Sequence, residues 1–196
     1  EIDAVCVLAR IGKVAAAMTA AILVEKYGVT HIVFTGVAGS GDKNVKVGDI
    51  VVAEALVQHD FDASPLFPQF EIPLTGLSRF ATDVALTERL ANAAAKTTRV
   101  HRGLIASGDK FIGRLAQIQA IKAGLPDLLA VEMEGAAVAQ VCFELGIPFA
   151  VIRTISDNAN DDAAVDFMHF IKTVASRYAF EVIHNFCHPD NPGGQV

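Results

Sequence analysis

Residues 128–157 read LLAVEMEGAAVAQVCFELGIPFAVIRTISD and combine two short apolar runs with a longer stretch between them. We predict strands over 128–131 and 149–155 and a helix over 135–145, because the two runs are nearly continuous Leu, Ile, Val and Ala and are bounded by turn signals. Such strands are typical of a mostly parallel or mixed sheet whose two faces are covered by helices. This segment therefore predicts an α/β fold.

The same alternation extends through the rest of the chain. Further apolar runs occupy residues 4–9, 14–27, 31–35, 49–57, 87–95, 100–107 and 116–123. A last helix is predicted from about 163 to 186, with Asp161 or Asp162 as its N-cap. Because no linker or internal repeat divides the chain, we expect one domain over residues 1–188, followed by a flexible tail over 189–196.

The composition indicates a tightly packed protein that does not bind polyanions. Of the 196 residues, 52% are apolar and only 19% are charged, which suffices to fill a large core. The formal net charge of −6, without a basic stripe, excludes a nucleic acid or an anionic membrane as the partner. No apolar stretch reaches the ~20 residues that a membrane-spanning helix needs.

The cysteines and histidines predict neither disulfides nor a metal site. Cys6, Cys142 and Cys187 are odd in number and far apart, which favours a reducing compartment, and we expect the protein in the cytoplasm. His184 and His188 can share one helix face with Cys187. Histidine is favourable at the carboxyl end of a helix without any ligand, so we predict no metal there.

A long irregular stretch, residues 61–78, contains three prolines among apolar side chains. Loops of this length in compact domains usually bind a ligand or form an interface. The apolar residues Leu66, Phe67 and Pro68 make it a candidate contact surface.

The glycine-rich segment GVAGSG, residues 36–41, follows a predicted strand, so its backbone could approach a ligand closely. It lacks the Lys-Ser or Lys-Thr of a P-loop, and no helix opens directly behind it as in a dinucleotide-binding fingerprint. A simple turn between two strands is the alternative interpretation.

Glu132 and Glu134 flank Met133 where a predicted strand ends and a helix begins. A carboxylate can accept two hydrogen bonds side by side, which suits the 2′- and 3′-hydroxyls of a ribose. The alternative is that both carboxylates stabilise the amino terminus of the helix, where negative charge is favourable.

Asp157 directly follows a strand that we expect to be buried. Burial disfavours the charged form, and a protonated aspartate can act as a general acid toward a departing purine. The competing interpretation is an ordinary Asx turn, because Ser156, Asn158 and Asn160 are also turn formers.

The sequence also resembles a known family. Six blocks occur in the order found in 5′-methylthioadenosine/S-adenosylhomocysteine nucleosidases: IGKVAAA (11–17), TGVAG (35–39), VGDIVV (47–52), RGLIASGD (102–109), VEME (131–134) and ISD (155–157). The resemblance places the chain in the purine nucleoside phosphorylase/uridine phosphorylase superfamily. It implies a three-layer α/β/α sandwich around a central mixed, partly barrel-like sheet, and hydrolysis of 5′-substituted adenosines without a metal or organic cofactor.

Position by position, the resemblance implies a role for each residue of an adenine nucleoside site. Asp157 is the acid that protonates N7, and Glu134 binds the ribose hydroxyls. The other residues placed at the substrate are Phe111 (stacking on adenine), Ile112 (backbone contact to the base edge), Met133 (packing on the sugar), Glu132 (supporting), Phe167 (5′-substituent pocket), Val37 and Ser156. A second subunit is expected to complete the pocket through 66–68, so the resemblance implies a homodimer.

Three departures from the family pattern bear on the chemistry. Family members usually begin some forty residues earlier and carry there a glutamate that activates the attacking water, so this glutamate is expected to lie outside the sequence given. Val37 stands where a serine is common, and Ala9-Arg10 replaces a frequent Ser-Gly pair. Two alternatives therefore remain: a phosphorylase, toward which Arg10 points, and a non-catalytic nucleoside-binding protein.

Overall fold

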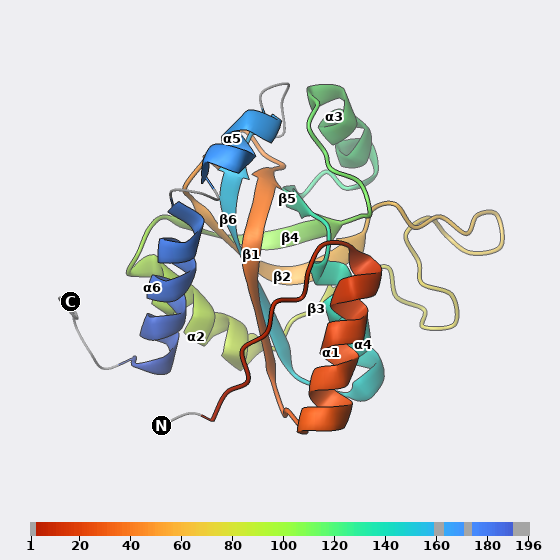
Figure 1. Cartoon of the computed structure of the whole chain (residues 1–196). Coiled ribbons are helices and arrows are strands. Elements are labelled where there is room, and N and C mark those ends of the chain that lie inside the picture. The colour runs from red at the N-terminus through yellow and green to blue at the C-terminus, as the bar shows by residue number, and fades with distance from the viewer. Residues whose placement is uncertain (1–2, 159–162, 171–173, 190–196) are drawn as a thin grey trace.

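The computed structural model of the chain describes residues 3–158, 163–170 and 174–189. Within these residues a six-stranded mixed sheet lies at the centre and helices surround it (Figure 1). The elements are α1 (Lys13–Tyr27), β1 (Ile32–Ser40), β2 (Ile50–Gln58), β3 (Phe80–Ala81), α2 (Val84–Ala95), β4 (Val100–Ser107), α3 (Leu115–Gly124), β5 (Leu128–Glu132), α4 (Gly135–Leu145), β6 (Phe149–Asp157), α5 (Ala163–Phe170) and α6 (Ser176–Cys187).

The sheet curls until its strands close on one another. The strand order is β3-β2-β4-β5-β1-β6, and β2 pairs with β6 as well, which joins five of the strands into a barrel. Strands β2, β4 and β5 run parallel, as do β1 and β6, whereas the β1–β5 and β2–β6 pairs are antiparallel. The predicted mixed, partly barrel-like sheet is confirmed.

Two pairs of helices cover the sheet from opposite sides, as Figure 1 shows for α1 with α4 and for α2 with α6. The α1 and α4 helices approach closely because small buried residues face the contact, among them Ala16, Ala20 and Ala139. On the other side, Leu90 of α2 and Val182 of α6 join a second core with strand residues. The α/β/α layering expected from the sequence is therefore present.

Local sequence signals set the ends of several helices. Asp83 caps α2 by accepting a hydrogen bond of 2.7 Å from the Leu86 N–H. Gly28 and Gly146 end α1 and α4 in the left-handed conformation that glycine adopts without strain. Helix α4 begins differently: Glu134 is its N-cap residue but does not cap it with its side chain.

Some elements differ from the predictions. Residues 4–9 form neither strand nor helix and are largely exposed. The glycine-rich segment 36–41 is not a simple turn, because β1 continues through it to Ser40. The single helix predicted over 163–186 is two helices, α5 and α6. Asp161 and Asp162, the expected caps, lie outside the described residues, as does the predicted tail beyond Pro189. None of the described helices has the length and apolar character needed to span a membrane.

The 61–78 loop projects from the rest of the molecule, on the right of Figure 1. Leu66 and Leu74 on this loop are 84% and 95% exposed. Phe70 and Leu74 adopt positive φ angles of 69°, which strain a residue that has a Cβ. The loop is thus a defined, apolar projection, as its composition predicts.

Candidate active site

Strand pairing brings the predicted site residues to one edge of the barrel. Gly39 on β1 pairs with Val131 on β5 and with Asp157 on β6. Adjacent strands lie about 5 Å apart, so the ends of β5 and β6 are separated by about 10 Å. Glu132, Glu134 and Asp157 thus belong to one region although more than twenty residues separate the glutamates from the aspartate in sequence.

Glu132 is fully engaged by protein groups. Its carboxylate accepts hydrogen bonds from the Gly135 N–H at 2.8 and 3.0 Å, from the Glu134 N–H at 3.2 Å and from the Ser107 hydroxyl. These contacts stabilise the amino end of α4, where a carboxylate is electrostatically favourable. The helix-cap interpretation therefore holds for Glu132, and its support of the site is indirect.

Arg153 completes the surroundings of Glu132. Its guanidinium lies 2.5 Å from the Glu132 carboxylate, and the two side chains are only 1% and 2% exposed. The guanidinium also stacks over the Phe34 ring at 4.3 Å, and a Cβ at Gly36 would come within 3.0 Å of it. Sequence reasoning assigns no role to Arg153, although an arginine inside an otherwise apolar strand is a signal of a buried ion pair.

Glu134 retains the capacity to bind a ligand. Its carboxylate accepts a hydrogen bond of 2.9 Å from the Gly12 N–H at the start of α1. Burial, followed by repulsion from Glu132, raises the pKa of the Glu134 carboxyl above its usual value. A half-buried carboxylate with acceptor capacity left is suited to bind a diol.

A polar network fixes the start of α1 against this edge. The Lys13 N–H donates to Asp109 at 2.7 Å, the Asp109 N–H donates to Asp60 at 2.8 Å, and the Lys13 ammonium lies 2.7 Å from the Asp60 carboxylate. Sequence reasoning missed this network, because its members lie 47 or more positions apart from Lys13. It positions Gly12 next to Glu134.

Asp157 is the last residue of β6 and is 2% exposed. The Ser156 hydroxyl donates to its carboxylate at 2.8 Å and lies 3.3 Å from the Ala38 carbonyl oxygen. Asp157 therefore ends a buried strand, as the sequence predicts.

Aromatic residues lie at the outer part of the predicted site. Phe111 is 43% exposed, and its ring meets the Phe167 ring edge-on with centroids 5.8 Å apart. Ile112 beside it is buried, whereas Met133 and Val37 are half-buried. The structure thus brings together two residues that the resemblance places on the base and on the 5′-substituent. Across the described residues, no His, Cys, Asp and Glu side chains cluster as a metal site would require.

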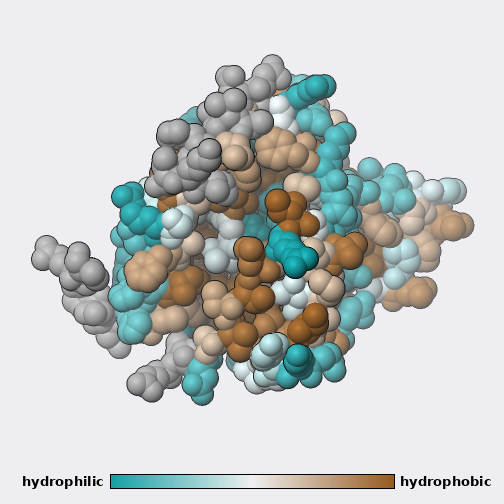
Figure 2. Space-filling model, in the orientation of Figure 1, coloured by the Kyte–Doolittle hydropathy of each residue, from teal (hydrophilic) through white to brown (hydrophobic). Residues whose placement is uncertain are grey.

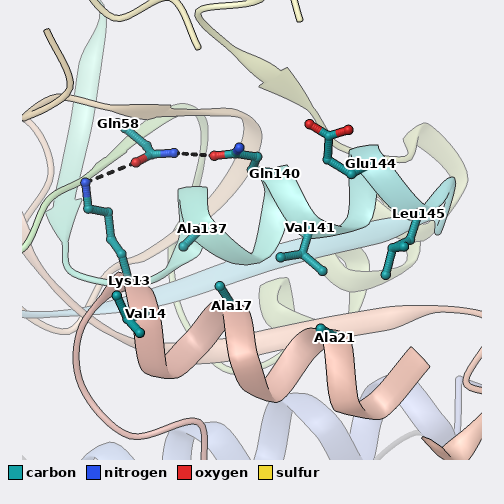
Figure 3. A pocket seen from close by; sticks show the side chains of 10 residues that line it. All are labelled: Lys13, Val14, Ala17, Ala21, Gln58, Ala137, Gln140, Val141, Glu144 and Leu145. Atoms are coloured by element: carbon teal, nitrogen blue, oxygen red, sulfur yellow. Dashed lines mark hydrogen bonds between the residues drawn. The ribbon is translucent and has the colours of Figure 1, made fainter. Parts of the chain in front are cut away.

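A separate groove of about 420 Å³ runs between α1 and α4. Figure 3 shows its polar end, where Lys13 donates to Gln58 at 3.0 Å and Gln58 donates to Gln140 at 2.7 Å. Toward its other end it is lined by Ala17, Ala21, Val141 and Leu145, together with the carboxylate of Glu144 (Figure 3). The groove does not include Glu134 or Asp157, so we interpret it as a contact surface and not as the nucleoside site.

Exposed apolar side chains gather beside this groove. Figure 2 shows them over the amino-terminal segment and α1. They include Leu8, Ile11, Val14 and Met18, which are between 53% and 86% exposed. A patch of this kind usually marks an interaction site.

Known proteins share both the sequence and the fold. The family model of the phosphorylase superfamily matches residues 2–186. A 5′-methylthioadenosine/S-adenosylhomocysteine nucleosidase of Shewanella denitrificans is 38% identical over 183 residues, which cover 92% of this chain and 80% of the relative. A nucleosidase of the same name from Geobacillus kaustophilus is 37% identical over 182 residues, or 91% of this chain and 77% of that protein.

Solved structures agree with this assignment. The crystal structure of the 5′-methylthioadenosine/S-adenosylhomocysteine nucleosidase of Neisseria meningitidis in complex with methylthio-immucillin-A has a TM-score of 0.88 at 34% identity, covering 93% of this chain and 79% of that one. The futalosine hydrolase of Helicobacter pylori has a TM-score of 0.82 at 34% identity, with coverage of 90% and 77%. The chain thus belongs to the phosphorylase superfamily and, within it, to the 5′-methylthioadenosine/S-adenosylhomocysteine nucleosidases.

Proposed function

We propose that this protein hydrolyses the N-glycosidic bond of 5′-substituted adenosines such as methylthioadenosine and S-adenosylhomocysteine, releasing adenine and the thioribose. The observation that carries the proposal is the placement of two carboxyl groups in different environments at one edge of the barrel. Asp157 is 2% exposed at the end of β6, and Glu134 is half-buried beyond the end of β5. The substrates are those in the names of the relatives.

Asp157 acts on the leaving base. We infer that it protonates N7 of the purine, so that the electron pair of the C1′–N9 bond passes to a neutral leaving group. The Ser156 hydroxyl donates to the Asp157 carboxylate at 2.8 Å and orients it. Phe111 stacks on adenine, and the backbone of Ile112 contacts the base edge.

Glu134 acts on the sugar. Its carboxylate accepts hydrogen bonds from the 2′- and 3′-hydroxyls. The electrostatic attraction between this carboxylate and the ribose strengthens as positive charge develops on the sugar in the transition state. Met133 packs against the sugar, and Phe167 lines the pocket of the 5′-substituent. Glu132 and Arg153 hold the start of α4 and thereby position Glu134. A water oxygen forms the new bond to C1′ as the C1′–N9 bond breaks, and the extra proton of this water passes to the solvent.

Release of adenine tests the proposal. The protein is incubated with methylthioadenosine in phosphate-free buffer, and products are separated by chromatography. We expect adenine and methylthioribose in equal amounts. No turnover of any adenine nucleoside would contradict the proposal.

Two alternatives give different results in the same assay. A phosphorylase would need phosphate for product formation and would yield a ribose 1-phosphate; the cationic Arg10 favours this alternative. A non-catalytic member would bind adenine, through Phe111 and Asp157, without releasing it from the nucleoside.

We further propose a homodimer that works in the cytoplasm, in the salvage of methionine. The α1–α4 groove and its apolar neighbours support a second copy as the occupant, and Leu66 on the projecting loop is 84% exposed and available to complete the partner's pocket. The cysteines Cys6, Cys142 and Cys187 are unpaired, which is usual for a protein of a reducing compartment.

A further inference from the structure

Arg10 adopts a backbone conformation that strains it. It lies in the segment that leads into α1, and its φ angle is 63°, in the left-handed region. Glycine tolerates this conformation, whereas a residue with a Cβ does so only at a cost. The chain thus keeps an arginine where a glycine would relieve strain, and strained residues concentrate at functional sites.

The guanidinium of Arg10 is available for a ligand. The residue is exposed and forms no hydrogen bond or ion pair within the part of the chain that the structure describes. Two carboxylates at the start of α1 are engaged by backbone N–H groups: Glu134 accepts from Gly12, and Asp109 accepts from Lys13. In a protein with a net charge of −6, an exposed guanidinium without an ion-pair partner is a local site of positive charge that can attract an anionic ligand.

The position of Arg10 relates it to the sugar end of the proposed substrate. Gly12, two residues further on, contacts Glu134, which holds the ribose in the proposed function. The base is directed inward, toward Asp157 at 2% exposure. If the base and the diol are held inside, the 5′-substituent passes Phe167, and its far end extends outward, toward exposed residues near Gly12.

We propose that Arg10 is a specificity-determining residue that binds an anionic group, the carboxylate on the 5′-substituent of the substrate, and so favours S-adenosylhomocysteine over methylthioadenosine. This inference rests on the proposed nucleosidase function. A guanidinium binds a carboxylate through two parallel hydrogen bonds, whereas the methylthio group offers no charged partner. Free phosphate has related chemistry and is the other source of an anion, so the test includes it.

The test measures kcat/KM for S-adenosylhomocysteine and for methylthioadenosine. Each is measured with the full-length wild-type protein and with the variants Arg10→Gln, Arg10→Lys and Arg10→Gly. For Arg10→Gln we expect kcat/KM for S-adenosylhomocysteine to fall about tenfold, mainly through KM, because the carboxylate is bound equally in the ground and transition states. The value for methylthioadenosine should change less than about twofold. Arg10→Lys should restore part of the loss, and Arg10→Gly should match Arg10→Gln without lowering the thermal unfolding midpoint. Lys26→Gln, at the far end of α1, controls for net charge.

Each possible result either supports or contradicts the proposed role of Arg10. Equal losses for both nucleosides, or no loss for either, would overturn it while leaving nucleoside hydrolysis intact. A loss seen only in phosphate-dependent turnover would overturn it in favour of a phosphate-binding arginine. Absence of turnover by the wild-type protein would instead contradict the proposed function itself. An analogue of S-adenosylhomocysteine without the carboxylate should be insensitive to all three substitutions.

Discussion

Two glutamates separated by one residue have opposite surroundings. Glu132 is saturated by N–H groups, a hydroxyl and the Arg153 guanidinium, with both charged side chains at 1–2% exposure. Removing one partner of such a buried pair leaves an uncompensated charge and typically costs about 3–5 kcal/mol. Glu134 accepts instead from the backbone N–H of Gly12 and is less buried. Glu132 therefore anchors the helix, whereas the carboxylate of Glu134 keeps acceptor capacity for the ribose contact that we propose.

The raised pKa of Glu134 predicts how kcat/KM depends on pH. Binding of the diol needs the ionised carboxylate, so kcat/KM should fall as the pH drops through a value above 4.5, the ordinary pKa of a glutamate. Glu134→Gln should lower activity and abolish this acid limb. The measurement is a pH profile of kcat/KM, with Glu25→Gln on the exposed face of α1 as the control. An unchanged acid limb in Glu134→Gln would show that another group is responsible.

The same shift affects stability with a defined sign. Because the pKa of Glu134 is higher in the folded protein than in the unfolded chain, ionisation of this carboxyl lowers the stability of the folded state. This loss of stability is absent below pH 4.5 and reaches its full size above the folded-state pKa. Glu134→Gln should therefore raise the free energy of unfolding at pH 7, by less than about 1 kcal/mol because the group is partly solvated, and should not raise it below about pH 4. Denaturant unfolding at both pH values checks this.

At the scale of elements, the junction of β5 and α4 depends on Gly135. A Cβ at this position would lie 2.6 Å from a Leu56 side-chain carbon and 3.2 Å from both Glu132 carboxylate oxygens. Helix propensity alone favours alanine over glycine by about 1 kcal/mol. Steric crowding of a packed junction opposes it with about 1–3 kcal/mol.

We therefore expect Gly135→Ala to lower the free energy of unfolding by up to about 2 kcal/mol and to lower kcat/KM, because Glu134 shifts with Glu132. Denaturant unfolding and steady-state kinetics on the same samples check both effects. A more stable variant with full activity would mean that the junction relaxes without cost.

Elements with strong local signals were predictable from the sequence. The predicted ranges 100–107 and 135–145 coincide with β4 and α4, because apolar runs and flanking turn signals act locally. The contacts of Glu132 and Glu134 were not predictable by position alone, since Ser107, Arg153 and Gly12 reach them through strand pairing and helix packing. The resemblance supplied what spacing could not, namely roles for Glu134 and Asp157, and those roles remain predictions.

At the scale of the molecule, the exposed apolar surface is concentrated on one side of α1. A domain with a large core has no need to expose Val14 at 80% and Met18 at 53%. Burial of apolar area contributes roughly 25 cal/mol per Å², so a second copy on this surface would stabilise the assembly.

The variant Val14→Glu should convert the proposed dimer into a monomer. A charge in the centre of the contact is costly to desolvate, whereas the side chain is too exposed to matter for folding of one subunit. Light scattering after size-exclusion chromatography measures the mass, and adenine release should fall with it. Val84→Glu, similarly exposed at 75% on α2, is the matched control. A wild-type protein that runs as a monomer would rule out this assembly.

The central claim is that a buried acid on β6 drives departure of adenine. The most direct test is kcat for adenine release from methylthioadenosine in phosphate-free buffer, compared between the wild-type protein and Asp157→Asn, with Asp127→Asn as the control for an exposed aspartate. Loss of a general acid predicts a decrease of about 10²–10⁴-fold for Asp157→Asn, with adenine binding retained. A kcat within a few-fold of wild type would contradict the account.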